Sequence, residues 1–179
     1  KRTIGIGPRK NKTFKVECPT TYLSTISFQN GSVIRLTLSF DVIAHQRNHI
    51  ELYGDKGSII VPDPNMFGGS VYTCKKLGDP WKEHKTNKMP LGKINIRSQS
   101  SRANESSTNS NYRGAGLAEM AYSIQNKKIN KCNGELSLHI LDIIQSMMKA
   151  CKTGKAQSIK TTCKKPQPFS LNEIRKILK

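Results

Sequence analysis

Apolar and polar side chains alternate along much of residues 22–42, and no other feature constrains the fold as strongly. A period of two is typical of a half-buried β-strand, and the pattern occurs on both sides of an Asn-Gly pair. A three-residue loop ending at Gly31 would pair Ile26 with Ile34 and bury one face of both strands, whereas a two-residue turn would mix the faces. The sequence therefore predicts a β-hairpin whose loop holds Gly31 in the left-handed conformation.

The stretch HIELYGDKGSIIVPDPNMFGG, residues 49–69, could be a phosphate-binding loop or a simple turn. A phosphate-binding loop leads from a strand into a helix, whose N-terminus meets the anion. Here the turn GDKG is followed by the strand-like run SIIV, which favours a second hairpin with Leu52 opposite Ile59. The prolines that follow would end the strand, and a Phe-Gly-Gly corner would lead into a further extended run.

The second half of the chain is predicted to be largely helical. Apolar residues recur at helical spacing from Leu117 to Ile124 and again from Leu136 to Cys151, with Gly154 placed to end the second helix. A capping box at residues 170–173 would start a last helix. Strands followed by helices indicate an α+β fold, with a mostly antiparallel open β-sheet and helices packed on one face.

A chain of 179 residues is long enough for one compact domain and short for two. We therefore predict a single domain over residues 1–179, entered by an irregular segment at residues 1–15. Residues 82–111 are polar and include a tract rich in Ser and Asn. A loop of this length is typically either a functional lid or disordered, and we favour disorder.

The net charge of +18 suggests a nucleic-acid partner, because Lys and Arg neutralise phosphates. However, only eight of the 30 basic residues are Arg, which is the residue suited to bidentate contacts with bases and phosphates. The lysines are spread over tails and loops without interleaved aromatic residues. The pattern therefore argues against nucleic acid and favours a general lysine bias.

Five cysteines without a C-x-x-C pair indicate reduced, mostly buried thiols rather than disulfides or a zinc site. His45 and His49 lie beside a strand pattern, which would hold them too far apart to share a metal ion. No apolar run is long enough to cross a bilayer, and the first residues lack the apolar core of a signal peptide. We therefore expect a cytoplasmic protein without membrane contact and without a metal site.

Three polar residues are candidates for a cleft. Asp41 and His45 stand where a strand is predicted to end, and Arg113 stands where the polar loop enters a helix through RGAG. Residues at the ends of elements often line binding sites. An ordinary charged rim explains the same positions equally well, and both interpretations remain open.

Five segments follow one another in a recognisable order, namely VECPTTY, FQNGSVIRLTLSFDVIAH, HIELYGDKGSIIVPDPNMFGG, YRGAGLAEMAYSI and GELSLHILDIIQSMM. In sequence and spacing they resemble the C-terminal domain of the Gfo/Idh/MocA oxidoreductases. The pairing of IELYGDKGSIIVPDPNMFGG with a downstream RGAGLAEM is the most specific part of this resemblance. It extends from about Gly7 to about Leu171.

The resemblance implies a parent enzyme with an N-terminal Rossmann domain that binds NAD or NADP. The C-terminal domain would carry a large, mostly antiparallel sheet, shape the substrate site and support homo-oligomerisation through the sheet face. The substrate would be a sugar, an inositol or a related polyol. Asp41, His45, Tyr112 and Arg113 are the candidates for the substrate cleft, through the SFD-x-x-x-H and YRG segments.

The family's dinucleotide motif and its catalytic lysine belong to the first domain and are not found in this sequence. We therefore assign no catalytic, cofactor-binding or metal-binding residue here and expect the isolated chain to be inactive and to bind no NAD(P). Two alternatives remain. One is a stand-alone, non-catalytic module that oligomerises through its sheet, and the other, less favoured, is a basic nucleic-acid-binding protein.

Overall fold

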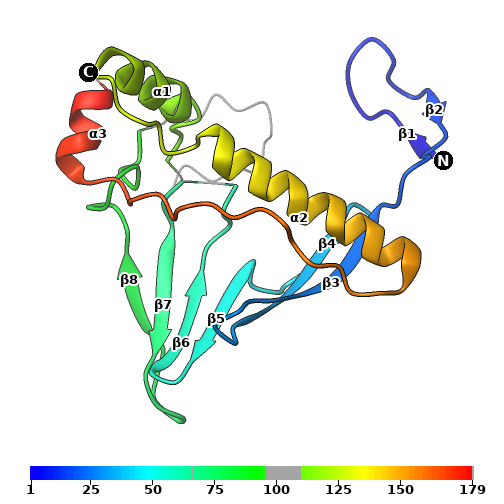
Figure 1. Cartoon of the computed structure of the whole chain (residues 1–179), viewed down its shortest axis with the longest axis horizontal. Helices are drawn as coiled ribbons and strands as arrows, with labels where there is room; N and C mark the ends of the chain where they lie inside the picture. The colour runs from blue at the N-terminus through cyan, green and yellow to red at the C-terminus, as the bar shows by residue number, and fades with distance from the viewer. Residues whose placement is uncertain (66, 96–109, 179) are drawn as a thin grey trace. The chain divides into compact units, whose positions relative to one another are not determined.

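The computed structural model describes residues 1–65, 67–95 and 110–178, which form two compact units (Figure 1). The first unit is residues 1–46 and the second is residues 47–179. The first unit contains β1 (Arg2–Thr3), β2 (Thr13–Phe14), β3 (Thr21–Ser27) and β4 (Val33–Ser39). The second contains β5 (Ile50–Gly54), β6 (Gly57–Val61), β7 (Ser70–Cys74), β8 (Lys82–Lys85), α1 (Ala115–Gln125), α2 (Gly134–Thr153) and α3 (Leu171–Ile177).

The β3–β4 hairpin of the first unit has the predicted register. Ile26 lies opposite Ile34, and the backbone N–H of Phe28 donates to the carbonyl of Ser32 at 2.9 Å. Gly31 has a φ of 84°, the left-handed conformation that glycine adopts without steric cost. The observed register and the left-handed Gly31 confirm the loop prediction, whereas the face predicted to be buried is only partly covered, since Ile34 and Leu38 are 45% and 46% exposed.

The first 15 residues are more ordered than predicted. Instead of an irregular segment, they form a short antiparallel pair, with Arg2 opposite Phe14 and Thr3 opposite Thr13. The sequence gives little sign of this pairing, because each strand has only two residues and neither alternates.

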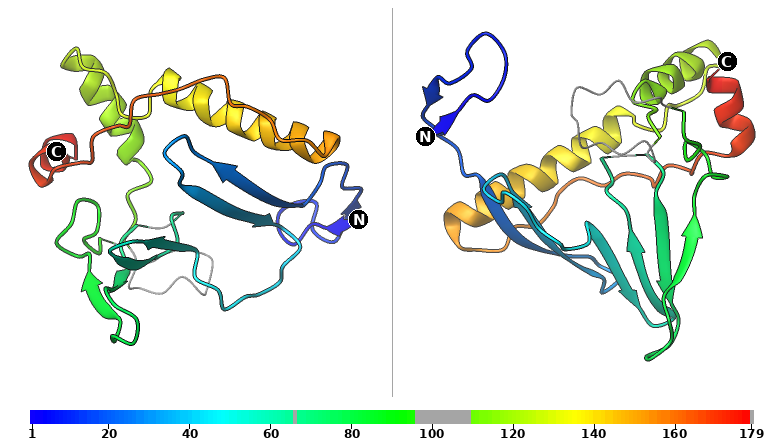
Figure 2. Two further views of the ribbon diagram at one scale, coloured as in Figure 1. Left: turned by 60° about the horizontal axis from the view of Figure 1, so that its bottom comes forward. Right: turned by 180° about the vertical axis from the view of Figure 1, so that it is seen from behind.

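The second unit contains an antiparallel sheet in the order β5-β6-β7-β8 (Figure 2). Leu52 lies opposite Ile59, as predicted for a hairpin around the GDKG turn. β6 ends at Val61, directly before Pro62, and β7 follows the glycine corner. Because the turn leads into a strand and not a helix, it offers no helix N-terminus to a phosphate.

The polar stretch predicted as a loop from residue 82 begins with a strand. β8 pairs with β7, with His84 opposite Val71, so the loop prediction is wrong at its start. β8 is an edge strand, and its two lysines suit an edge, where charge discourages pairing with other chains. Most of the predicted Ser/Asn tract at residues 98–111, namely residues 98–109, lies outside the described residues.

The end of α2 and the start of α3 follow the predicted capping signals. Gly154 ends α2 with a φ of 64°, and the Asn133 side chain caps its start by accepting from the Leu136 N–H. Ser170 and Glu173 form the predicted capping box at the start of α3. No described helix is both long and apolar enough to cross a membrane.

α1 buries a different face from the one predicted. The expected apolar stripe includes Leu117 and Ile124, whose exposed fractions are 68% and 70%. The opposite face is buried, with Ala115, Glu119 and Ser123 at helical spacing, and α1 packs against α3. The carboxylate of Glu119 accepts hydrogen bonds from the Ser123 hydroxyl at 3.0 Å and from the Lys131 N–H at 3.1 Å.

The buried apolar residues of the described chain lie in the helical part of the second unit. They are Ala115 of α1 and Ile174 and Ile177 of α3. The cysteines are free thiols, as predicted, but they are not buried: Cys18, Cys132 and Cys151 are exposed, and Cys74 and Cys163 are partly exposed.

The α+β fold class is confirmed. The described strands form three small antiparallel sheets, of two, two and four strands, where the sequence suggested one open sheet. The packing of the helices on one sheet face and the single-domain organisation stay predictions.

Candidate functional site

Three segments of the second unit meet at the end of the β6–β7 corner. We call this the corner cluster and define it as Asn65, Phe67, Gly68, residues 92–95 and residues 110–113. The backbone of Ser110 bridges to Phe67, with its N–H donating to the Phe67 carbonyl at 3.2 Å. The Ser110 hydroxyl donates to the carbonyl of Gly92 at 2.9 Å, and only 4% of this residue is exposed. Ser110 therefore joins the three segments.

Gly68 is required by the close packing of this junction. It has a φ of 75°, and a Cβ at this position would lie 3.1 Å from the Ser110 Oγ and 3.2 Å from the Gly92 carbonyl oxygen. The conformation and the contacts both favour a residue without a side chain. The sequence predicted this Phe-Gly-Gly corner as a simple turn. The absence of a side chain at Gly68 also allows the corner to pack closely against the segment 110–113, which we call the strip.

Tyr112, a predicted cleft residue, is held on two sides within the corner cluster. Its ring meets Phe67 edge-to-face at a centroid distance of 5.9 Å, and its hydroxyl donates to the Lys93 carbonyl at 3.0 Å. Edge-to-face pairs of this kind add to the stabilisation from burial. The ring is therefore fixed in position and only partly exposed.

Arg113, the second predicted cleft residue of this unit, follows directly and opens the turn into α1. Its Nη2 lies 3.4 Å from the Asn65 carbonyl oxygen, and its backbone N–H donates to the Asn111 Oδ1 at 3.2 Å. The residue is exposed. Its guanidinium is therefore held by the Asn65 carbonyl, while the residue remains accessible to solvent.

The side chain of Asn95 forms two hydrogen bonds with the backbone of Asn111. The Asn95 Nδ2 donates to the Asn111 carbonyl at 2.8 Å, and the Asn111 N–H donates to the Asn95 Oδ1 at 2.8 Å. This reciprocal pair imitates the two hydrogen bonds exchanged by paired residues of a β-ladder. The strip at residues 110–113 is therefore bonded along both of its sides.

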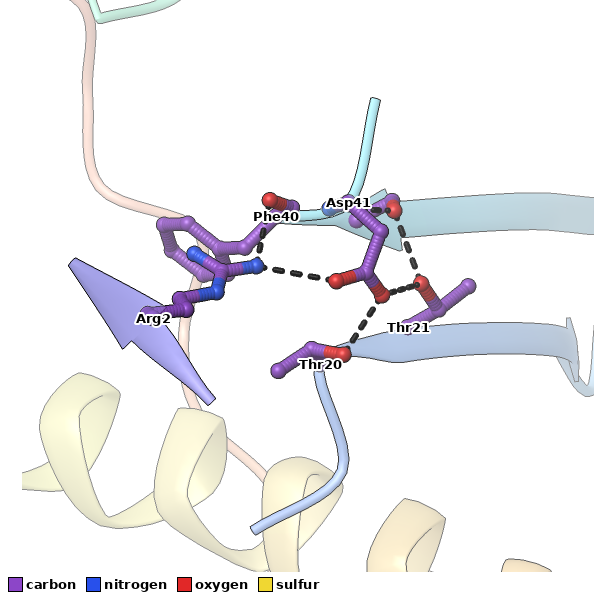
Figure 3. Close-up of polar contacts among 6 residues, drawn as sticks. Arg2, Thr20, Thr21, Phe40 and Asp41 are labelled. Atoms are coloured by element: carbon purple, nitrogen blue, oxygen red, sulfur yellow. Dashed lines mark hydrogen bonds and ion pairs between the residues drawn. The ribbon is translucent and has the colours of Figure 1, made fainter. Parts of the chain in front are cut away.

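Asp41 lies in the first unit, where it ties together the ends of three strands (Figure 3). Its carboxylate accepts from the hydroxyls of Thr20 and Thr21 and from the guanidinium of Arg2, the latter at 2.9 Å. These hydrogen bonds, from Thr20 first, then Thr21 and Arg2, hold the pKa of Asp41 below its ordinary value. The position predicted to face a cleft is thus engaged in local contacts.

The four predicted cleft residues are distributed over the two units. Asp41 and the exposed His45 belong to the first, whereas Tyr112 and Arg113 belong to the second and adjoin each other in the corner cluster. That all four line one substrate cleft stays a prediction. Sequence reasoning missed Asn95 and Ser110, although the glycine corner and the RGAG segment had each been recognised as distinctive.

A further polar cluster connects α2 to the segment before α3, which runs alongside the helix (Figure 2). The Oδ2 of Asp142 accepts from the Lys160 N–H, the Thr161 N–H and the Thr161 hydroxyl, each at 2.9 Å. The Thr161 backbone bond, followed by its hydroxyl bond, lowers the pKa of Asp142. The Nδ1 of His139 lies 3.0 Å from the same Thr161 hydroxyl.

The described residues include no group of three or more His, Cys, Asp or Glu side chains with metal-binding geometry. His49 pairs with Asp63, its Nε2 lying 3.8 Å from the carboxylate Oδ2. The corner cluster offers neutral hydrogen-bonding groups, the rings of Phe67 and Tyr112, and the cationic side chains of Lys93 and Arg113, a set that suits a hydroxyl-rich ligand better than a cation.

Comparison with known proteins gives one family match. The family model described as "Oxidoreductase family, C-terminal alpha/beta domain" matches residues 6–161, which span most of both units. Searches of curated proteins and of solved structures give no match. The motif segments that meet in the corner cluster lie within the matched region. The chain therefore belongs to the Gfo/Idh/MocA oxidoreductase family and represents its C-terminal α/β domain.

Proposed function

We propose that the chain is the substrate-binding and oligomerisation domain of an NAD(P)-dependent oxidoreductase that acts on a sugar, an inositol or a related polyol. The observation that carries the proposal is the meeting of the two family-like segments, PNMFGG and YRGAG, in the corner cluster. They lie far apart in the sequence, yet Phe67 contacts both Ser110 and Tyr112. A family domain that shapes a substrate site would be expected to build it where its distinctive segments converge.

The chemistry of the corner cluster suits a polyol. Such substrates present several hydroxyls, each able to donate and accept a hydrogen bond, on a ring or chain with apolar C–H faces. Arg113 offers several N–H donors, and the partly exposed ring of Tyr112 offers an aromatic surface. Rigid positioning of such groups is what allows a binding site to orient a substrate.

The nicotinamide cofactor would be held by another domain. The glycine-containing turn GDKG joins β5 to β6 and does not fit a dinucleotide pyrophosphate, because a strand and not a helix follows it. When bound, the cofactor would supply hydride acceptance or donation at the carbon that bears the reacting hydroxyl. This chain's contribution in that case is to bind and orient the polyol.

Direct binding measurements test the proposal. A panel of myo-inositol, glucose and their acid derivatives would be titrated into the chain and followed by ligand-observed NMR. We expect millimolar binding by at least one polyol and loss of that binding in Arg113→Ala. Arg35→Ala, which removes an exposed arginine from β4, is the matched control. Equal binding by wild type and R113A would contradict the assignment of the cleft.

The gene upstream of the Lys1 codon gives an independent test of the parent enzyme. An in-frame Rossmann segment would support the oxidoreductase, and a nearby start codon would favour a stand-alone oligomerisation module. The second candidate is supported by Leu52 and Ile59, which pair across β5 and β6 and are both exposed on one sheet face. A second copy of this face would bury them.

A further inference from the structure

We propose that Asn95 is a positioning residue that sets the orientation of Arg113 at the start of α1. The proposal rests on the proposed function in that Arg113 contacts the substrate. Asn95 itself would not touch the substrate. It would act through Asn111, because its side-chain amide donates to the Asn111 carbonyl and accepts from the Asn111 N–H.

In the first step of the proposed mechanism, Asn95 fixes the backbone of Asn111. The Asn95 amide satisfies both the carbonyl and the N–H of Asn111, each at 2.8 Å. A single hydrogen bond would hold only one of the two peptide groups that flank the Asn111 Cα, whereas the two bonds from one planar amide hold both of them. Asn111 is thus held much as a residue in the middle of a sheet is held.

The second step transmits this placement to Arg113. The Oδ1 of Asn111 accepts from the Arg113 N–H at 3.2 Å, an Asx-type turn that sets the direction in which the chain enters α1. α1 has no side-chain cap at its N-cap residue, Gly114, and the turn before it is held by the Asn111 side chain together with the Ala115 N–H, which donates to the Tyr112 carbonyl at 2.7 Å. The Arg113 side chain then reaches the Asn65 carbonyl at 3.4 Å.

The neighbouring bonds explain why Asn95 has a distinct role. Ser110 and Tyr112 fasten the strip to Gly92 and Lys93 through their own side chains, so they hold the strip in place. Neither reaches the backbone of Asn111. The Asn95 amide holds the two peptide groups that flank the Asn111 Cα, and through the Asn111 side chain it places the Arg113 N–H.

The variant Asn95→Asp tests the proposal, because the pH determines whether its side chain can form one or both of the hydrogen bonds to Asn111. At neutral pH its carboxylate can accept from the Asn111 N–H but faces the Asn111 carbonyl without a proton to donate. When the carboxyl is protonated, it can donate to that carbonyl and accept from the N–H, which restores both bonds of the amide. The variant should therefore be defective at pH 7 and recover as the pH falls through its carboxyl pKa, whereas Asn95→Ala should not recover.

Hydrogen exchange of the full chain measures the first part of the proposal. At pH 7 we expect the Asn111 amide to lose protection roughly tenfold in N95A only, because the N95D carboxylate still accepts from it, and the Arg113 amide to lose protection roughly tenfold in both N95D and N95A relative to wild type. At pH 4, with wild type at pH 4 as the reference, only N95D should regain that protection. Asn126→Asp, which removes a bond to the Tyr122 carbonyl at the other end of α1, is the matched control and should leave both amides unchanged.

Ligand binding separates this inference from the proposed function. Using the tightest polyol of the panel as the probe, we expect N95D to weaken binding roughly tenfold at pH 7 and to recover at pH 4. If wild type binds the probe and N95D binds it equally well at pH 7, the positioning role is wrong while the proposed function stands. If wild type binds no polyol, the proposed function fails, and the exchange data still decide whether Asn95 orients Arg113. Unchanged protection of the Arg113 amide in N95D at pH 7 would overturn the inference in either case.

Discussion

The ammonium group of Lys131 lies 3.0 Å from the Oε1 of Glu173, which places a cation from the α1–α2 connection on the first turn of α3. The same Nζ donates to the Gln167 carbonyl at 3.0 Å and lies 4.9 Å from the centre of the Phe169 ring. Burial of the Glu173 carboxylate acts to raise its pKa, but the hydrogen bonds from Lys131 and from the Ser170 N–H outweigh burial and lower it. Lys131 thus contacts both the segment that leads into α3, at Gln167 and Phe169, and the capping-box residue Glu173.

Replacement of Lys131 by Met should loosen α3. The substitution keeps much of the aliphatic stem but removes the ion pair, the bond to Gln167 and the contact with the Phe169 ring. We expect a loss of about 1–2 kcal/mol in the free energy of unfolding, measured by urea denaturation, because the pair is only partly exposed. Lys176→Met, at an exposed position of the same helix, should cost less than about 0.5 kcal/mol. Equal losses in the two variants would contradict the role of Lys131.

The contacts of Asp142 predict a dependence of stability on pH. Because the folded chain lowers the pKa of this carboxyl, its stabilising effect is present at neutral pH and is lost as the pH falls through the lowered value. The variant Asp142→Asn should therefore melt at a lower temperature than wild type at pH 7, and the difference should shrink at a second pH below the ordinary pKa of an Asp side chain. A difference in melting temperature that is the same at both pH values would show that the charge of Asp142 is not involved.

Gly68 and Gly116 form a matched pair for substitution by alanine. Gly68→Ala introduces a Cβ at a positive φ and against Ser110 and Gly92, so we expect a loss of about 1–3 kcal/mol. Gly116 lies in α1, and a Cβ there would meet nothing within 4 Å, so Gly116→Ala should stabilise the protein by up to about 1 kcal/mol. Thermal denaturation of the two variants should give shifts of opposite sign. A stabilised G68A variant would show that the corner is not packed as described.

The exposed face around Leu52 predicts an effect on self-association. Lysine at this position would place a charge on the proposed interface, where 52% of the leucine is exposed in the single chain. Light scattering coupled to size exclusion should show a smaller assembly for Leu52→Lys than for wild type. Tyr72→Lys, on the opposite face of the same sheet, serves as the control and should leave the mass unchanged. A monomeric wild type would remove the proposal of oligomerisation through this face.

The features predicted correctly from the sequence are those that a few neighbouring residues determine. The β3–β4 register follows from the alternation of side chains and from one glycine with positive φ. The capping box of Ser170 and the end of α2 at Gly154 likewise depend on contacts within one turn of chain. Local chemistry and tertiary structure agree at these positions, so the pattern alone is sufficient.

The features missed depend on partners that are distant in the sequence. The buried face of α1 is decided by α3 and by the backbone of Lys131, which select the side with Glu119 and leave Leu117 exposed. The corner cluster could be suspected from two distinctive motifs. However, the bonds of Asn95 connect residues 16 positions apart through an amide, and no periodicity records such a contact.

The family match ends at residue 161, but the folded unit does not. Ile174 and Ile177, which with Ala115 make up the buried apolar residues of the described chain, lie beyond that limit. A recombinant fragment trimmed to the family boundary would lack α3. The face of α1 that packs against α3, which starts at Ala115, would then be exposed. Expression vectors for this domain should therefore extend at least to Leu178, since a shorter product is expected to be prone to proteolysis and aggregation at its helical end.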